Sequence, residues 1–321
     1  DDELKSLKEY MSLYLTVVAN PLLLASLPDV DNLSFLANMI RSGACNGRED
    51  VYCNLRKGED VEGLNKGVWA QYRCNYTEWG GKKYIDREHG GAIGINFDIG
   101  DYSLIGLYIK GNKHNMSQLN NSGNLVKGMV GVCGAFLYDR FELKWIVGYS
   151  FGRHNMCLEG RNSNKVRGKF GVQGVGLDIE GALKIVASDT LKIRPYIRLE
   201  GDMEDHEKMK EGKLSIEGGD CSRLLATAGV RVSFNVGKSE FSGGVGYKCL
   251  LSKETFAVKL ALKEGVSKYI NSVKEGRHKG VVGIGWNYDI SKCVGLHAGV
   301  NYVGGKNYKN VGGTAGINIR F

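Results

Sequence analysis

The chain has 321 residues, of which 46 are Gly and only 3 are Pro, and its formal net charge is +8. Gly is about twice as frequent as its usual share of ~7%, and together with the scarcity of Pro this favours strands and excludes a Pro-rich disordered chain. Lys and Arg are interspersed with Asp and Glu and form no dense basic run, so the charge excludes the usual kind of basic nucleic-acid-binding protein.

Hydrophobic residues make up 42% of the chain, yet no stretch holds the roughly 18 consecutive apolar residues that a membrane-spanning helix needs. If the chain crosses a membrane, it must therefore do so as a closed barrel, in which every backbone polar group pairs between strands. Half of the side chains of such a barrel face a polar interior, so a moderate average hydropathy is no objection.

The first 66 residues have a helical period, with Leu4, Leu7 and Met11 at helical spacing and a second helical patch from Asp31, which can serve as an N-cap, through Ile40. The start is acidic and has no initiator Met, which is not typical of a secretory signal peptide. We therefore expect residues 1–66 to be a helical linker and the chain to be a trimmed fragment.

From Gly67 onward the period changes to two. Between Phe141 and Phe151 every second residue is apolar, while polar residues and Gly fill most of the other face, as in a strand with one apolar and one wet side. The same pattern predicts twelve strands, an even number as in single-chain bacterial barrels. They are expected near 67–79, 84–99, 102–112, 124–138, 141–153, 165–181, 191–202, 222–236, 238–250, 277–289, 292–303 and 311–321.

Short turns alternate along the chain with mostly longer polar connections, which indicates two unlike ends. In outer-membrane barrels the short turns are periplasmic and the long loops face outward. We therefore expect both ends of the barrel sequence at the periplasmic side. The outside loops are expected at 77–90, 112–124, 153–165, 202–222, 251–276 and 304–310.

A soluble β-sandwich or small soluble barrel would also alternate. Its strands are usually about 5 to 6 residues long, roughly half the length expected here. Aromatic residues also gather at the strand ends, where interfacial girdles lie in membrane barrels; they are Trp79, Tyr102, Tyr138, Phe141, Tyr288 and Tyr302. The predicted fold class is all-β, a twelve-stranded antiparallel transmembrane β-barrel over 67–321 with an N-terminal helical segment over 1–66.

Charged residues on the polar face of these strands are the candidates for a lumen lining. They carry both signs, so ion pairs between them are expected. The candidates are Arg73, Lys110, Glu142, Lys144, Asp178, Arg198, Glu200, Arg231, Lys248 and Arg320.

Over residues 66–321 the pattern resembles the autotransporter β-domain of type V secretion. The stretch 67–70, Gly-Val-Trp-Ala, resembles the opening of the first strand in that family, and 191–196, Leu-Lys-Ile-Arg-Pro-Tyr, resembles its entry to the middle strand. Further similar pieces are 211–212 and 229–231, which resemble the family's Glu-x-Gly and Gly-x-Arg, and 301–302 and 312–321, which resemble its last two strands. The order and spacing of these pieces carry the resemblance.

The resemblance implies an outer-membrane translocator pore that exports an upstream passenger to the bacterial cell surface. It also implies a helix inside the pore, a position that residues 1–66 occupy; the alternative is a periplasmic or disordered lead. A C-terminal assembly signal of Ile317, Ile319 and Phe321, read by the barrel-assembly machinery, is implied as well, although the family frequently has an aromatic residue at the position of Ile319. Outer-membrane lipid is the remaining partner, and the barrel is expected to be monomeric.

Catalytic chemistry is not expected. The chain has none of the usual nucleophile, zinc-protease or phosphate-loop motifs. Asn20, Asn32 and Asn38 could suggest self-cleavage, but a helix break and a solvated helix face explain them better. Eight scattered Cys show no metal-ligand spacing, so we expect no metal and no cofactor, and some of these Cys could pair in an oxidising periplasm.

Two other functions stay open. One is a stand-alone outer-membrane porin or adhesin barrel, and the other is a soluble β-rich binding module.

Overall fold

The computed structural model describes residues 66–79, 84–99, 102–119, 121–159, 165–186, 188, 190–211, 214–218, 221–252, 257–262, 267–271 and 276–321. Within these residues no helix has the length and apolar character needed to cross a membrane. The predicted helical linker lies outside the described residues except for Lys66.

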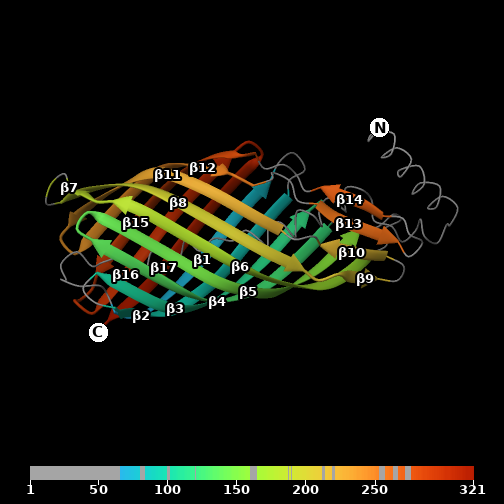
Figure 1. Ribbon diagram of the computed structural model, residues 1–321, viewed down its shortest axis with the longest axis horizontal. Coiled ribbons are helices and arrows are strands. Elements are labelled where there is room, and N and C mark those ends of the chain that lie inside the picture. The colour runs from blue at the N-terminus through green and yellow to red at the C-terminus, as the bar shows by residue number, and fades with distance from the viewer. Residues whose placement is uncertain are drawn as a thin grey trace.

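Twelve long antiparallel strands form one closed barrel (Figure 1), which confirms the predicted fold class. They are β1 (Gly67–Trp79), β2 (Tyr84–Asp98), β3 (Ser103–Gln118), β4 (Asn121–Tyr138), β5 (Phe141–Glu159), β6 (Lys165–Leu183), β8 (Leu191–His206), β11 (Cys221–Val236), β12 (Ser239–Leu250), β15 (His278–Asp289), β16 (Val294–Gly305) and β17 (Tyr308–Arg320). The barrel closes where β17 pairs with β1, from Gly67 opposite Arg320 to Trp79 opposite Tyr308.

The alternation of β5 separates two environments. Val147, Tyr149 and Phe151 are exposed on the outside of the wall, whereas Lys144 and Ser150 are buried on its inner face. Apolar outer faces and polar inner faces recur around the barrel, because a spanning barrel must present hydrocarbon-compatible side chains to lipid.

Five short strands lie outside this scheme. Strand β7 (Ile185–Val186) pairs with β8 at the end of the barrel where Gly67 and Phe321 lie. At the other end β9 (Met209–Glu211), β10 (Leu214–Gly218), β13 (Ala257–Leu262) and β14 (Ser267–Asn271) form a separate four-stranded sheet (Figure 1). This sheet joins two segments that were expected to be outside loops, because β10 pairs with β13.

Several of the expected outside loops are shorter in the structure; β5, for example, continues to Glu159, into the expected loop 153–165. Residues 112–124 and 304–310 were expected to be outside loops. In the structure β3 continues to Gln118 and β16 continues to Gly305, and the chain reverses in a tight turn after each of these strands. Leu119 and Asn307 adopt positive φ angles of 52° and 59° there. These parts of the strands extend beyond the apolar belt, so their outward residues are polar. Their low hydropathy therefore suggested loops, although the backbone continues as paired strand.

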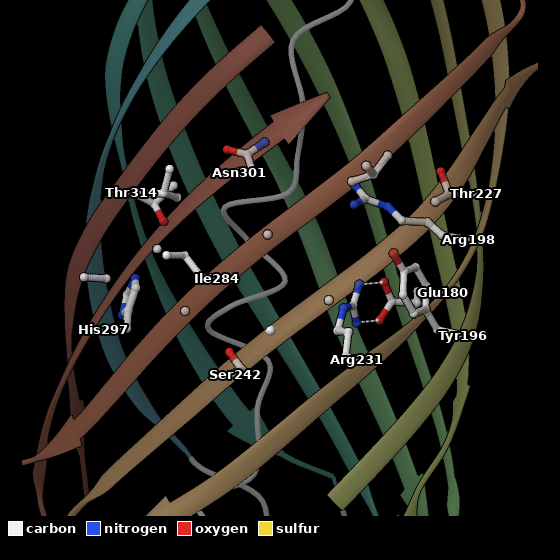
Figure 2. Close-up of a pocket in the computed structure, with 18 of the residues that line it drawn as sticks. Glu180, Tyr196, Arg198, Thr227, Arg231, Ser242, Ile284, His297, Asn301 and Thr314 are labelled. Atoms are coloured by element: carbon white, nitrogen blue, oxygen red, sulfur yellow. Dashed lines mark hydrogen bonds and ion pairs between the residues drawn. The ribbon is translucent and has the colours of Figure 1, made fainter. Parts of the chain in front are cut away.

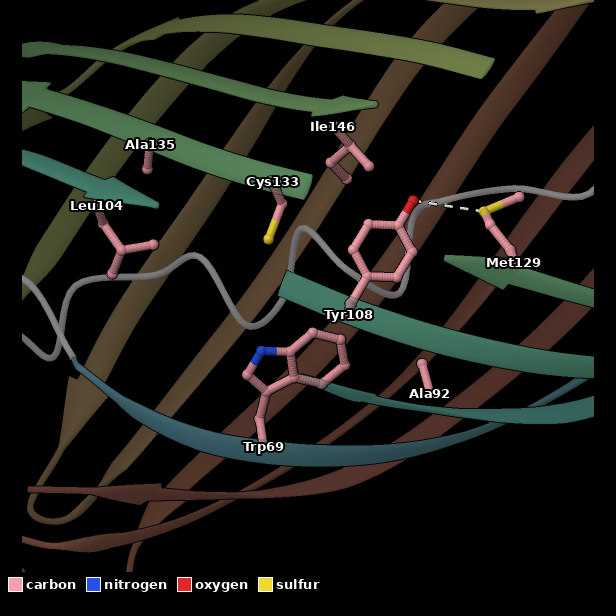
Figure 3. Packing of buried hydrophobic residues seen from close by; sticks show 8 residues of the cluster. All are labelled: Trp69, Ala92, Leu104, Tyr108, Met129, Cys133, Ala135 and Ile146. Carbon is pink, nitrogen blue, oxygen red and sulfur yellow. Dashed lines mark hydrogen bonds between the residues drawn. The ribbon is translucent and has the colours of Figure 1, made fainter. Parts of the chain in front are cut away.

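Apolar side chains also pack inside the barrel, against the wall formed by β1 to β5 (Figure 3). Trp69 lies across the inner face, and its indole N–H donates to Asn96 at 3.3 Å. A Cβ at Gly94 would come within 2.4 Å of the Trp69 ring, so only glycine fits beneath it. The cluster consists of Trp69, Ala92, Leu104, Tyr108, Met129, Cys133, Ala135 and Ile146.

Candidate functional site: the polar interior of the barrel

A cavity of about 220 Å³ lies inside the barrel and is bounded by side chains from opposite walls (Figure 2). Arg73 comes from β1, Lys144 from β5 and Arg231 from β11, so the cavity spans the interior and is not a groove between two neighbouring strands. Arg198 and Lys248 line it as well. Five of the ten charged residues proposed from the sequence therefore border one cavity.

The first ion-pair group joins β6, β8 and β12. Asp178 and Glu200 are directly opposite each other in the β6–β8 ladder, an arrangement of like charges that is unfavourable by itself. Arg198 relieves it, because its guanidinium donates to the two Asp178 oxygens at 2.9 and 2.5 Å and lies 3.4 Å from Glu200. Lys248 Nζ lies 2.9 Å from the same Glu200.

The second group centres on Arg231 of β11. Its guanidinium donates to both oxygens of Glu180 at 2.5 and 2.7 Å (Figure 2), the bidentate geometry that makes Arg–carboxylate pairs strong. The same guanidinium lies 3.9 Å from the centre of the Tyr196 ring, a distance at which a cation is attracted to the ring face. Two strands, β6 and β11, are thus linked across β8 through side chains.

Of the remaining predicted residues, Glu142 and Arg320 lie at the end of the barrel that carries Gly67 and Phe321, whereas Lys110 lies halfway along β3. Glu142 has Arg194 at 3.4 Å and Lys144 at 3.7 Å. Arg320 Nη2 contacts Asp289 Oδ1 at 2.6 Å. Lys110 is buried on β3. The residues of the expected assembly signal, Ile317, Ile319 and Phe321, are exposed on the outer side of the closing strand.

Sequence reasoning missed the carboxylates of Glu180 and Asp289, although Glu180 has the same inward parity as Asp178. Parity gives the face of a residue but not its partner, because the partner depends on the register of strands that are distant in sequence. Arg231 and Glu180 are 51 residues apart.

A second polar cluster lies at the end of the barrel that carries the small sheet. His154 is fully buried, and its ring stacks on Phe170 with centroids 4.6 Å apart. His206 lies 5.9 Å from it, measured between ring centroids. Neither ring nitrogen of His154 has a hydrogen-bond partner among the described residues. Lys127 forms an ion pair with Glu204 beside this cluster.

Among the described residues no three His, Cys, Asp or Glu side chains are grouped so that they could hold a metal ion. Six cysteines are described, and all six are free thiols: Cys74, Cys133, Cys157, Cys221, Cys249 and Cys293.

The closed antiparallel wall, its apolar outer belt and its charged interior define a transmembrane β-barrel of the outer-membrane class. The sequence profile described as autotransporter beta-domain matches residues 68–301. Because this match covers most of the chain, the protein belongs to the autotransporter β-domain family. It is therefore a translocator barrel of the bacterial outer membrane, as expected, and the family match does not favour the porin or adhesin alternative.

Solved structures agree with this fold. The translocator domain of autotransporter NalP from Neisseria meningitidis has a TM-score of 0.69 and 17% identity, covering 91% of this chain and 98% of that one. The β domain of the Bordetella autotransporter BrkA gives a TM-score of 0.65 and 13% identity over 80% and 100% of the two chains. The transport unit of AIDA-I from Escherichia coli gives 0.62 and 14% over 90% and 99%. No curated protein sequence matches the chain significantly.

Proposed function

We propose that the interior of this barrel is the conduit for an upstream passenger and that the ten charged residues named from the sequence line it. The observation that carries the proposal is the cavity bounded by Arg73, Lys144 and Arg231 from opposite walls. Many of the charges on the wall are already paired with each other. A polar wall whose charges are already paired stays hydrated and offers few strong binding contacts to a passing chain. Such a wall suits export, because the passenger must not bind tightly to the lumen.

The linker, residues 1–66, enters the lumen as a helix in this proposal. The last residue of the linker lies at the rim of the barrel, where the Lys66 carbonyl accepts the Phe321 N–H at 3.3 Å. The preceding residues can enter the lumen from this position. Charge supports it too. Residues 1–66 carry 11 acidic and 7 basic side chains, a net charge of −4, so with a total of +8 the remaining residues carry +12.

The partners in this proposal are the passenger, outer-membrane lipid and the barrel-assembly machinery, and the barrel works as a monomer. The end that carries the four-stranded sheet faces outward, and the end with Gly67 and Phe321 faces the periplasm. The chain performs no catalysis and needs no cofactor. Its work is passage, which requires a lined opening and not a reacting group.

Single-channel recording in planar bilayers tests the position of the linker. Deleting residues 1–66 should raise the conductance relative to the full chain, because a helix in the lumen displaces ions and water. The deletion variant must still shift its gel mobility on boiling, which shows an intact barrel. An unchanged conductance in a heat-modifiable variant would place the linker outside the lumen.

A further inference from the structure

The outer face of β2 to β6 changes character towards the end with the small sheet. Ile93, Ile109, Val130 and Phe151 are exposed apolar residues of the belt. Beyond this belt the outward positions of β2, β3, β5 and β6 carry exposed cations, which we call the outer basic patch. It consists of Arg87, Lys113, Arg153, Arg167 and Lys169.

Strand register brings these cations together. Lys113 of β3 pairs with Val126 of β4, and Val126 pairs in turn with Arg153 of β5. Lys113 and Arg153 are therefore two strand spacings apart, about 10 Å at their backbones, within reach of one ligand for two long side chains. Arg87 lies on β2 two residues from His89, the partner of Lys113.

Two more cations continue the row on β6. Arg153 pairs with Gly171, and Lys169 and Arg167 follow on the same face of that strand. The patch thus covers neighbouring strands on one side of the barrel, where β2 to β6 run side by side (Figure 1).

No ion pair joins any of these five cations to a described carboxylate. The acidic side chain of Glu207 is close to this region, but its carboxylate accepts the Gly171 N–H at 2.8 Å and pairs with none of the patch residues. Among the residues of β2 to β6 beyond the belt whose exposure the structure describes, none at an outward position is acidic; Glu159, the last residue of β5, is opposite Lys165 in the β5–β6 ladder. The interior cations described above, in contrast, have carboxylates within reach.

We propose that the outer basic patch binds the phosphate groups of glycolipid in the outer leaflet of the membrane. The inference rests on the proposed orientation, which puts the end with the small sheet at that leaflet. The apolar belt takes the acyl chains of such a lipid, and the cations directly above it meet the phosphates. Arg87 and Arg153 can each present a planar guanidinium to two phosphate oxygens, the geometry that suits phosphate best.

Charge complementarity selects this occupant over a soluble one. The cations border a surface that is buried in hydrocarbon, so a ligand that joins acyl chains to anionic phosphate satisfies both halves of the surface at once. Attraction between clustered Lys and Arg and an anionic membrane surface contributes appreciably per residue, and the described acid nearest to these cations, Glu207, accepts a backbone N–H of Gly171 and forms no ion pair with them.

Native mass spectrometry of the full chain in detergent provides the test, with bisphosphorylated lipid A and dephosphorylated lipid A as the two probes. The patch variant is Arg87→Gln/Lys113→Gln/Arg153→Gln. The matched control removes three exposed cations from turns at the opposite end, Arg140→Gln/Lys238→Gln/Lys292→Gln. Both variants are first checked for a mobility shift on boiling, so that loss of the barrel is not mistaken for loss of binding.

Wild type and control should bind the phosphorylated probe more tightly than the dephosphorylated one, and the patch variant should bind it at least about tenfold more weakly. The proposal is overturned if the patch variant binds the phosphorylated probe as tightly as wild type, or if the control variant loses as much affinity as the patch variant. It is also overturned if wild type binds the phosphorylated and the dephosphorylated probe equally tightly. Displacement by inorganic phosphate would show a simple anion site and would overturn it too. Single-channel conductance of the patch variant should stay at the wild-type value, so the outcome is separate from that of the conduit.

Discussion

Two residues of β12 meet opposite surroundings although they are only three positions apart. Val245 is 62% exposed on the outer face, between Val230 and Val282 of the neighbouring strands. Ser242 lines the interior cavity. An Arg at the bilayer midplane on the lipid face costs about 2 to 4 kcal/mol, whereas an interior position tolerates charge.

Val245→Arg should therefore lower the free energy of unfolding by about 2 to 4 kcal/mol, and Ser242→Arg by much less. Urea titration in lipid vesicles, read by the mobility shift of unboiled samples, measures both. Equal losses, or a greater loss for Ser242→Arg, would mean that the register of β12 is displaced by one residue.

The Glu180–Arg231 pair allows a test of the interior network. Glu180→Leu leaves the Arg231 guanidinium without its bidentate partner and should destabilise the barrel by about 1 to 3 kcal/mol, since an orphaned charge loses its compensation. The double variant Glu180→Leu/Arg231→Leu should lose less than the sum of the two single variants in the same urea titration. Strict additivity would show that the two side chains do not interact.

At the scale of elements, the closing strand β17 decides whether the wall has free edges. It pairs with β1 and β16 along its whole length, and an unpaired edge inside a membrane would leave backbone groups unsatisfied. Ile317, Ile319 and Phe321 present an outward apolar edge on this strand. We expect this edge to act as the assembly signal.

Deleting Phe321 should lower the amount of heat-modifiable protein in the outer-membrane fraction sharply, measured by fractionation and immunoblotting. Phe141→Ala, which removes another exposed aromatic residue, is the control and should reduce the level only slightly. Normal assembly after the deletion would show that Phe321 does not contribute to an assembly signal.

The strands of the barrel were predictable to different degrees. The period of two located β15 and the start of β5 well, because each has a run of outward apolar residues. The same rule ended β3 near residue 112 and β5 near residue 153, each six positions before the strand ends at Gln118 and Glu159, because there the outward residues become polar beyond the belt. The hydropathy of the outward residues shows where contact with lipid ends, whereas backbone hydrogen bonding between strands determines where the strand itself ends.

The four-stranded sheet at the outward end could not be predicted for a related reason. Gly218 of β10 pairs with Val258 of β13, and nothing local links two segments so far apart in sequence. The interior network has the same limit. Parity placed Asp178 and Arg231 on the inner face, but the partners followed only from the relative register of β6, β8 and β11.

For the whole molecule, the inner and outer surfaces have separate tasks. The inner wall offers paired charges on the side of β6 to β12 and an apolar cluster around Trp69 and Tyr108 on the side of β1 to β5. The outer wall offers an apolar belt with cations on one margin. A barrel built in this way stays in the membrane through its outer surface and leaves its interior available for passage.

Surface display of a fused reporter tests the central claim most directly. A small epitope domain is fused upstream of Asp1, and the fusion is expressed in a Gram-negative bacterium. Intact cells are then either labelled with antibody or treated with protease. If the barrel exports the segment upstream of it, the reporter is labelled and cleaved on intact cells while the barrel stays protected. A reporter that remains inaccessible, although the barrel is present in the outer membrane and heat-modifiable, would contradict the central claim.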